Sequence, residues 1–202
     1  MRKETDMPDH YYTENPGSAH AERRIALRAL GNALTFITDA GVFSRDGLDR
    51  GTELLLDALP PLKGRVLDLG CGWGAVGVAL GKRYPELDIV MTDINSRAVG
   101  LARRNLAENG VSATVLQGDG FAAVEGRFDA IVTNPPIRAG KAVVYGLFAH
   151  AREHLNPGGA LYAVIRKQQG APSALKYLRE IYPRAETVGR GSGFHVLRAS
   201  GD

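Results

Sequence analysis

Short apolar runs alternate with amphipathic segments from residue 65 to the end of the chain. Apolar runs bounded by Gly, Pro or Asn predict strands, and apolar positions three and four apart predict helices. The predicted strands are 65–69, 88–92, 113–117, 128–133 and 160–165, and the predicted helices are 75–83, 96–108, 141–153 and 173–181. Continuous apolar strands that alternate with helices are typical of a parallel sheet covered on both faces.

Both ends of the chain depart from this alternation. The last two predicted strands, 184–189 and 194–199, have only a short turn between them, so they must pair as an antiparallel hairpin. Residues 24–38 predict a second hairpin with its turn at Gly31-Asn32, and a helix follows over 48–59. The pattern therefore predicts an α/β three-layer domain, 48–202, with a mostly parallel seven-stranded sheet, and an N-terminal extension, 1–47, packed on it.

Other segments of the pattern predict turns and loops. Residues 156–159 (NPGG) are predicted to close the helix over 141–153 before the next strand begins. No run approaches the ~18 apolar residues of a membrane span. The N-terminal residues are polar and show no signal peptide, so we expect a cytoplasmic protein without a membrane partner.

Composition and charge narrow the class of protein. Of 202 residues, 44% are hydrophobic and 23% charged, as in a globular domain, and the net charge of +3 permits a polyanionic partner without requiring one. A single cysteine, Cys71, excludes an internal disulfide and a Cys-based zinc cluster. Only His150 and His154 have a spacing that could suit a metal, and no third ligand lies near them in the sequence, so we expect no metal site.

Glycine is unusually frequent, with 25 residues in 202. Five of these glycines (70, 72, 74, 77 and 81) follow the strand 65–69 directly and run into the next helix. Glycine permits positive φ and a close approach of a ligand to the backbone, and the helix N-terminus behind it offers N–H donors. Because ligands of such sheets bind at the carboxyl ends of the strands, the segment predicts a cofactor loop.

Two cofactors compete for this loop. Residues 70–75 (GCGWGA) fit the dinucleotide pattern G-x-G-x-x-[GA], and Asp93 ends the next strand at a position suited to a ribose. Asp68, just before the loop, argues against a pyrophosphate, since two like charges ~4 Å apart cost about 4 kcal/mol at an effective dielectric of 20. A carboxylate suits the α-ammonium of S-adenosylmethionine, although Asp68 could also simply cap the following helix.

Two further segments lie at the carboxyl ends of predicted strands. Asp119 ends the strand 113–117, where it could accept a hydrogen bond from an adenine amino group or serve only in a turn. Residues 132–137 (VTNPPI) end the strand 128–133. Methyl transfer to an exocyclic amine needs two acceptors that hold its N–H groups, direct the lone pair and stabilise the developing positive charge. The side-chain oxygen of Asn134 and the carbonyl of Pro135 are suited to this task.

The segments 68–72 (DLGCG) and 134–136 (NPP) resemble the class I S-adenosylmethionine-dependent methyltransferases that modify amino nitrogens. Residues 10–16 (HYYTENP), 39–44 (DAGVFS), 134–141 (NPPIRAGK) and 167–172 (KQQGAP) look like the small ribosomal-RNA guanine-N2 methyltransferases. The resemblance implies a Rossmann-like fold, methylation of guanine N2 in small-subunit (16S) ribosomal RNA, and S-adenosylhomocysteine as product.

The resemblance also implies roles for individual residues. For the cofactor these are Thr52, Asp68, Gly70, Cys71, Gly72, Gly74, Asp93, Ile94, Asp119, Gly120 and Asn134. Asn134 and Pro135 would hold the target amine, and the residues implied around the RNA are Phe43, Pro136, Ile137, Arg138, Lys141 and Lys167. Longer family members carry a second half that 202 residues cannot hold, and many have an aromatic residue where this chain has Ile137, so Phe43 or Phe194 would supply the ring.

Other functions stay open at this point. An amino methyltransferase of protein glutamine or of adenine in DNA or RNA usually has that aromatic residue. A non-catalytic RNA-binding assembly factor would not need Asp68 and Asn134, and a nicotinamide oxidoreductase is disfavoured by Asp68. Basic residues at the carboxyl ends of strands favour RNA. They are Arg138, Lys141, Arg166 and Lys167, with Arg23, Arg24 and Arg28 in the extension.

Overall fold

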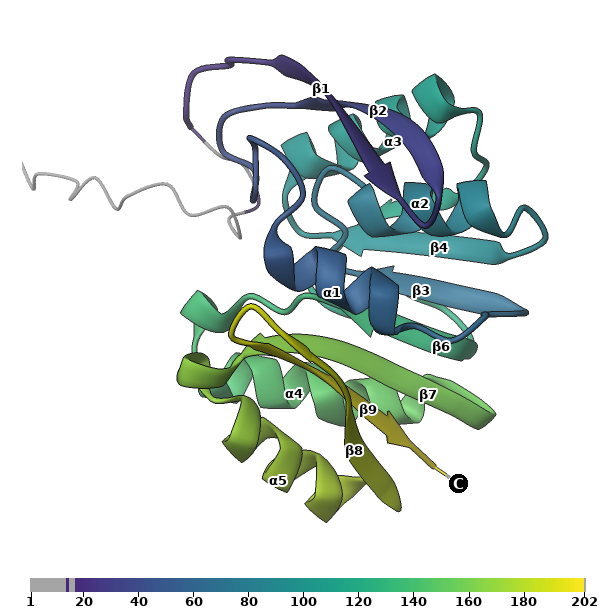
Figure 1. Ribbon diagram of the computed structural model, residues 1–202, viewed down its shortest axis with the longest axis vertical. Coiled ribbons are helices and arrows are strands. Elements are labelled where there is room, and N and C mark those ends of the chain that lie inside the picture. Colours follow the sequence, from purple (N-terminus) through teal and green to yellow (C-terminus); the bar gives the residue numbers. More distant parts are fainter. Residues whose placement is uncertain (1–13, 15–16, 202) are drawn as a thin grey trace, which may run out of the picture.

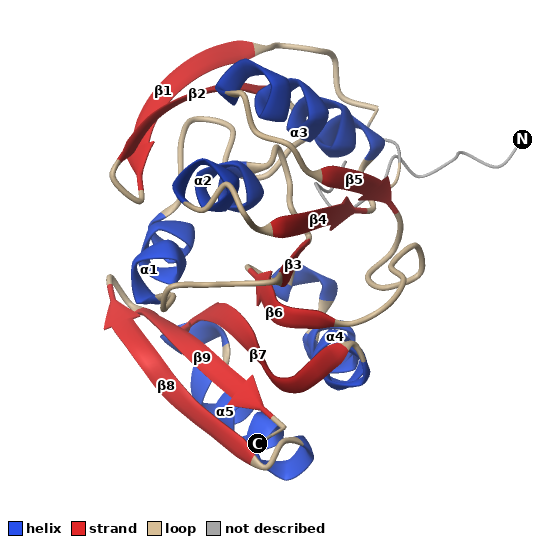
Figure 2. Ribbon diagram, turned by 90° about the vertical axis from the view of Figure 1, so that its right-hand side faces the viewer, coloured by secondary structure: helices blue, strands red, loops and turns tan. Residues whose placement is uncertain are grey.

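A seven-stranded sheet with the order β5-β4-β3-β6-β7-β9-β8 forms the centre of the computed structural model, which describes residues 14 and 17–201 (Figures 1 and 2). Its strands are β3 (Arg65–Leu69), β4 (Asp88–Asp93), β5 (Thr114–Gln117), β6 (Phe128–Thr133), β7 (Leu155–Arg166), β8 (Arg184–Gly191) and β9 (Phe194–Ser200). The first five run parallel, and β9 pairs antiparallel with both β7 and β8.

Helices cover both faces of this sheet. They are α1 (Arg50–Ala58), α2 (Ala75–Arg83), α3 (Ser96–Asn109), α4 (Lys141–Glu153) and α5 (Ala171–Ile181), with the short 3-10 turns η1 (Ile137–Ala139) and η2 (Lys167–Gln169). One apolar core joins α1, α2 and α3 to the sheet, and a second joins α4 and α5 to its opposite face. Alternate residues of the strands feed the two cores: Val66 faces the first and Leu67 the second. The predicted three-layer Rossmann-like fold is confirmed.

A hairpin of β1 (Arg23–Ala29) and β2 (Asn32–Thr38) forms a separate two-stranded sheet that packs on α3 and α2. Phe36 is fully buried and meets the edge of Trp73, so the hairpin shares the core of the α2 and α3 layer. The division into an extension, 1–47, and a domain, 48–202, stays a prediction.

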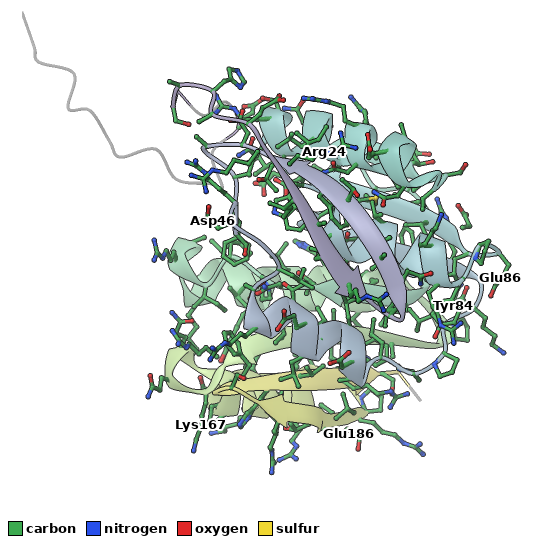
Figure 3. All side chains as sticks on the ribbon, turned by 45° about the horizontal axis from the view of Figure 1, so that its top comes forward. Arg24, Asp46, Tyr84, Glu86, Lys167 and Glu186 are labelled. Atoms are coloured by element: carbon green, nitrogen blue, oxygen red, sulfur yellow. The ribbon has the colours of Figure 1, made fainter. Side chains whose placement is uncertain are left out.

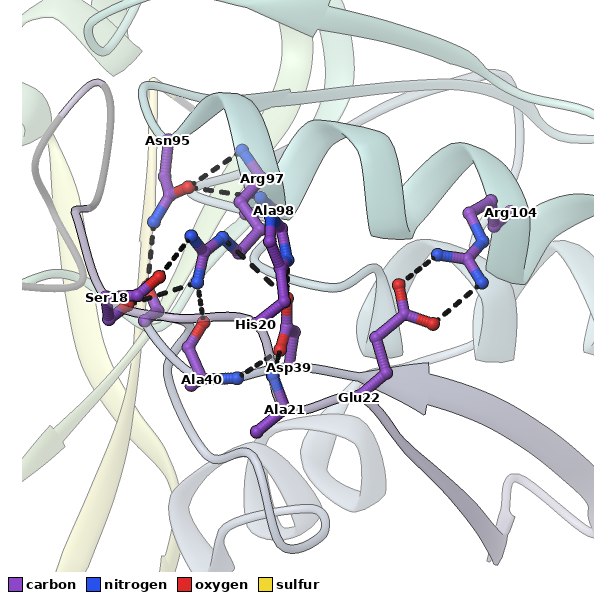
Figure 4. A network of polar contacts seen from close by, with 11 residues as sticks. Ser18, His20, Ala21, Glu22, Asp39, Ala40, Asn95, Arg97, Ala98 and Arg104 are labelled. Atoms are coloured by element: carbon purple, nitrogen blue, oxygen red, sulfur yellow. Dashed lines mark hydrogen bonds and ion pairs between the residues drawn. The ribbon is translucent and has the colours of Figure 1, made fainter.

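Buried polar contacts tie the residues before and after the hairpin to the start of α3 (Figure 4). Arg97 donates to the carbonyls of Ser18 and Ala40, and the buried Asp39 accepts from His20 and the Ala21 N–H. Burial raises the pKa of the Asp39 carboxyl, but these hydrogen bonds outweigh that effect, and the pKa lies below its usual value. The segment 39–44, singled out in the sequence, is therefore anchored beside the carboxyl end of β4.

Some predicted turns and boundaries were wrong. The β1–β2 turn is at Leu30 and Gly31, with φ of 49° and 82°, and Asn32 already belongs to β2. A two-residue turn of this kind needs positive φ at both positions. Residues 156–159 lie within β7 rather than in a loop, and they form an irregularity in its pairing with β6 between Leu155 and Ala160. Gly159 fits there because a Cβ would be 2.8 Å from the Phe128 carbonyl. Helix α5 begins at Ala171, because Pro172 fits the first turn of a helix.

Some sequence features lie outside these elements. Of the segment 10–16, only Glu14 is among the described residues, and its carbonyl accepts from the Ser96 N–H. No helix of the described residues is both long and apolar enough to span a bilayer.

Candidate functional site

A cavity of about 290 Å³ opens at the carboxyl ends of β3, β4 and β6. The loop before α1 covers one side of it, and the start of α4 closes another. Twelve of the residues predicted from the sequence line it: Phe43, Thr52, Asp68, Gly70, Cys71, Gly72, Asp93, Ile94, Asp119, Gly120, Asn134 and Pro136. The fold thus brings most of the predicted site together, and their contact with a ligand stays a prediction.

The glycine loop offers few free donors. The N–H groups of Gly70 and Cys71 both donate to the Thr92 carbonyl, and that of Gly72 donates to Asp93 Oδ2. Gly70 and Gly72 have φ of 74° and 54°, which lets the loop fold back on β4 to make these bonds. A loop whose donors are occupied and which lies between two carboxylates is a poor pyrophosphate site. This geometry disfavours a dinucleotide.

Asp68 is a buried carboxylate at the end of β3, only 3% exposed. Its Oδ2 accepts from the Gly77 N–H in the first turn of α2, which is the capping role considered as an alternative. Among the described residues, no donor reaches its other oxygen, Oδ1, and the side chain lines the cavity. Burial raises the pKa of Asp68 to about 7, and the nearby Asp93 charge adds to the shift. A cationic ligand group in the cavity would compensate this desolvated carboxylate.

Asp93 and Asp119 lie on the cavity wall formed by β4 and β5. Asp93 accepts from the N–H groups of Gly72 and Asn95, and burial nevertheless raises the pKa of its carboxyl. Asp119 is exposed and directly precedes the lining residue Gly120. The two carboxylates follow neighbouring strands, which suits the hydroxyl groups and the base of one nucleoside.

Asn134 follows β6 and lies against the first turn of α1. Its Nδ2 donates to Thr52 Oγ1 at 3.0 Å and to Asp49 Oδ2 at 3.3 Å. Asp49 caps α1 by accepting from the N–H of Gly51, and it also accepts from the Thr52 hydroxyl. No donor among residues 14 and 17–201 reaches Asn134 Oδ1, so this oxygen is available to a ligand in the cavity.

The residues after Asn134 take different directions. Pro136 and Ala139 line the cavity, whereas Pro135 is buried and its carbonyl accepts from the Ile137 N–H at 2.9 Å. Ile137 packs against the core on the α4 face and does not reach the cavity. The structure therefore does not bring Ile137 to a bound base, while Phe43, 40% exposed, lies on the cavity wall.

Four other predicted residues lie outside the cavity lining. Gly74 is buried under α3, where a Cβ would be 3.2 Å from the Cα of Ala102, so its role in the fold is packing. Arg138 and Lys141 are exposed next to the lining residues Pro136, Ala139 and Val143, and Lys167 is exposed directly after β7. The Lys141 ammonium is 5.0 Å from the Tyr145 ring centroid.

Sequence reasoning missed several residues of the site. Asp49 is the most important, because it contacts Asn134 from a different element. An Asp before a helix is typical of an N-cap, and only the fold shows what its second oxygen meets. The apolar walls were also missed; they include Val42, Leu48, Trp73, Val76, Val143 and Leu147.

The His154 side chain meets the backbone of His150 and not its ring: His154 Nδ1 lies 2.9 Å from the His150 carbonyl, and the His154 ring stacks on Phe121. In the described part of the chain, no three His, Cys, Asp or Glu side chains are grouped to hold a metal ion.

Comparison with known proteins identifies the family of this chain. The family model described as methyltransferase small domain matches residues 33–198. The chain belongs to this family. The expected methyltransferase family is thereby confirmed, and the match covers the glycine loop, Asp93, Asp119 and the segment 134–136.

Individual relatives of this methyltransferase small domain protein differ in length. The uncharacterized protein YbxB of Bacillus subtilis is 39% identical over 198 residues, which cover 96% of this chain and 98% of that protein. Ribosomal RNA small subunit methyltransferase C of Escherichia coli is 39% identical over 173 residues, 83% of this chain. The chain spans about half of the length of the latter relative, of which 50% is covered.

Solved structures agree with the fold. The Thermus thermophilus 16S rRNA N2 methyltransferase RsmC, solved with AdoMet and guanosine, matches with a TM-score of 0.81 and 30% identity. The match covers 93% of this chain and 52% of that one. A ribosomal protein L11 methylase of Lactobacillus delbrueckii matches with a TM-score of 0.66 and 25% identity, over 81% of this chain and 83% of that one.

Proposed function

We propose that this protein transfers a methyl group from S-adenosylmethionine to the exocyclic N2 amine of a guanine in small-subunit ribosomal RNA, leaving S-adenosylhomocysteine. One observation carries the proposal: the free Oδ1 of Asn134 and the buried Asp68 carboxylate line the same cavity. The relatives named for small-subunit rRNA methylation support this substrate, and so does the match to a structure solved with AdoMet and guanosine.

The cavity suits S-adenosylmethionine. Asp68 would accept from the α-ammonium, Asp93 from the ribose hydroxyls, and Asp119 from the adenine amine. Thr52, Gly70, Cys71, Gly72, Ile94 and Gly120 would complete the contacts. Gly74 would act on the cofactor only through the packing of α2. When bound, the cofactor supplies an electrophilic methyl group.

The chain's own chemistry is to orient the amine and stabilise its charge. Asn134 Oδ1 accepts one N–H of the guanine N2, and the second lone pair of the Pro135 carbonyl accepts the other. Two acceptors rotate the nitrogen lone pair out of conjugation and toward the methyl group, and they stabilise the positive charge that forms on nitrogen. Pro136 and Phe43 supply apolar surface for the base.

Cations around the mouth of the cavity support an RNA substrate. Arg138, Lys141, Arg166 and Lys167 are exposed, and none of the ion pairs found among the described residues involves them. In contrast, Arg23 and Arg24 of the hairpin pair with Asp46 and Glu108. We therefore assign RNA phosphates to the mouth rather than to the hairpin. We also propose the small ribosomal subunit as the partner and the cytoplasm as the location of this activity.

The decisive experiment offers one labelled cofactor to several acceptors. Purified protein and methyl-labelled S-adenosylmethionine are incubated with naked 16S rRNA, intact small subunits, DNA and ribosomal protein, and the products are digested to nucleosides for mass spectrometry. We expect N2-methylguanosine from one of the two RNA substrates. The variant Asn134→Ala should lose at least about 100-fold in kcat with cofactor affinity nearly unchanged. Label found as N6-methyladenine, or only in protein, would overturn the guanine assignment.

A further inference from the structure

We propose that Asp49 is a positioning residue that sets the orientation of the Asn134 side-chain amide, so that the amide oxygen and not the amide nitrogen faces the target amine. The proposal rests on the proposed function. Asp49 lies at the start of α1, 85 residues before Asn134 in the sequence, and the two side chains meet at the cavity.

Asp49 uses both carboxylate oxygens. Oδ1 caps α1 and accepts from the Gly51 N–H at 2.9 Å. Oδ2 accepts from the Thr52 hydroxyl and lies 3.3 Å from Asn134 Nδ2. Thr52 is buried, with 6% of its surface exposed, and Asp49 and Asn134 are half-buried. The cap holds the carboxylate still, and the second oxygen is thereby fixed against Asn134.

The charge on Asp49 decides the direction of every hydrogen bond in this group. An ionised carboxylate can only accept, so the end of the Asn134 amide that points at it must be the NH₂ group. The Thr52 hydroxyl gives its only proton to Asp49, so toward Asn134 it can only accept. Both neighbours therefore demand a donor from Asn134. Oδ1 is left facing the cavity, as an acceptor for the amine.

Replacing Asp49 by Asn would reverse the direction of the hydrogen bonds from residue 49 through Thr52 to Asn134 without breaking them. The N-cap requires the amide oxygen of the substituted side chain toward the Gly51 N–H, which leaves the new NH₂ group toward Thr52. The Thr52 hydroxyl would then accept from this NH₂ group and donate to Asn134, and the Asn134 amide would rotate to meet it. A donor would then face the amine, where an acceptor is needed.

The variant Asp49→Asn therefore separates positioning from folding. Asn caps helices about as well as Asp, so the thermal midpoint should stay within a few degrees of wild type. We expect kcat to fall by about 100-fold while the dissociation constant of S-adenosylmethionine changes by less than about threefold. The matched control is Asp57→Asn, the same substitution at an exposed position of the same helix, which should leave kcat and affinity unchanged.

Two further measurements complete the test. In the double variant Asp49→Asn/Asn134→Asp the amide and the carboxylate change places, and an acceptor again faces the amine, so kcat should recover at least about tenfold over Asp49→Asn alone. Independently of activity, the side-chain NH₂ resonances of Asn134 in ¹H–¹⁵N spectra should shift in Asp49→Asn and not in Asp57→Asn.

Three results would overturn the proposal. They are wild-type kcat in Asp49→Asn, a kcat loss accounted for by unfolding or by lost cofactor affinity, and unshifted Asn134 amide resonances. If no guanine is methylated by the wild-type protein, the resonance measurement still decides the role of Asp49, so failure of the proposed function and failure of this inference are distinguishable.

Discussion

Asp68 shows how burial gives one side chain both a structural and a binding role. It caps the first turn of α2 through Gly77, yet it has almost no access to water and lies near Asp93. Desolvation, the larger cause, raises its pKa to about 7 against the pull of the Gly77 hydrogen bond. The ionised form is therefore held at a cost in free energy, and a cationic ligand group in the cavity would relieve that cost.

This raised pKa predicts a pH-dependent cofactor affinity. Binding of an ammonium group needs the ionised carboxylate, so protons compete with the cofactor below pH 7. We expect the dissociation constant of S-adenosylmethionine to rise by about tenfold for each pH unit below the Asp68 pKa of about 7, and to level off above it. Isothermal calorimetry between about pH 5.5 and 8.5 measures this. A flat profile would contradict the assignment of Asp68 to the cationic end of the ligand.

The same pKa shift predicts that Asp68→Asn stabilises the fold and weakens the binding of S-adenosylmethionine. A carboxyl whose folded pKa is raised contributes stability that is complete below its unfolded pKa, near 3.8, and is lost as pH rises through about 7. At pH 8 without cofactor, Asp68→Asn should therefore be more stable than wild type by about 2 kcal/mol. It should also bind S-adenosylmethionine at least about 100-fold more weakly. Urea unfolding and calorimetry measure the two effects, and a destabilised variant would contradict the argument.

At the scale of elements, α2 packs close to β4, and glycine makes this possible. Gly77 lies in the interior of α2, where a Cβ would be 2.6 Å from Met91 Sδ on β4. Met91 is fully buried and pairs in register with Asp68 on β3. The close packing therefore places the first turn of α2 where its Gly77 N–H meets the Asp68 carboxylate.

Two alanine substitutions test this packing. Gly77→Ala should destabilise the protein by about 1–3 kcal/mol, because buried Met91 must move to admit the methyl group. The control is Gly100→Ala in the exposed face of α3, where no atom lies within 4 Å of the new Cβ. There the helix propensity of Ala should stabilise by about 0.5–1 kcal/mol. Chemical denaturation compares the two variants. Equal stabilisation of both would show that a methyl group at residue 77 fits between α2 and Met91, and would contradict the argument.

At the scale of the whole molecule, basic side chains lie at both ends of the sheet, and the cavity with Asp68 and Asn134 lies at one of these ends. Lys167 lies at the end where β7 finishes, far from Tyr84 and Glu86 at the opposite end (Figure 3). Lys82 and Arg83 end α2 near Tyr84, and the Arg83 guanidinium stacks on that ring. Removing two positive charges at either end therefore compares the contribution of each end to RNA binding.

Charge removal at the two ends should affect RNA differently. Arg166→Gln/Lys167→Gln should lower the affinity for a 16S rRNA fragment by about tenfold near 0.15 M salt and make the dependence of log K on log salt shallower by about 1–2. Lys82→Gln/Arg83→Gln removes the same charge at the far end and should change neither. Filter binding across a salt series measures both, and equal losses would indicate attraction by net charge alone.

The local sequence pattern was enough to predict the elements and their order. Strands such as β3 and β6 are short and mostly apolar, and β3 is followed by Gly70 and β6 by Asn134-Pro135, so they need little tertiary context. The motif at 68–72 and the segment 134–136 also showed where ligand chemistry is expected, because parallel strands present their carboxyl ends at one edge. The start of β7 could not be predicted this way, since Asn, Pro and Gly favour turns, and residues 156–159 form an irregularity in the pairing with β6 between Leu155 and Ala160.

Tertiary structure alone decided which side chains meet. The sequence by itself determined the layered fold, the glycine loop and the choice of Asn134 as the candidate acceptor for an amine. Only folding turned Ile137 toward the core and brought Asp49 against Asn134. Chain positions 85 apart carry no local signal of contact, and the contact exists because α1 packs on β7, β8 and β9 with its first turn against Asn134. The direction that we infer for the Asn134 amide follows from that contact.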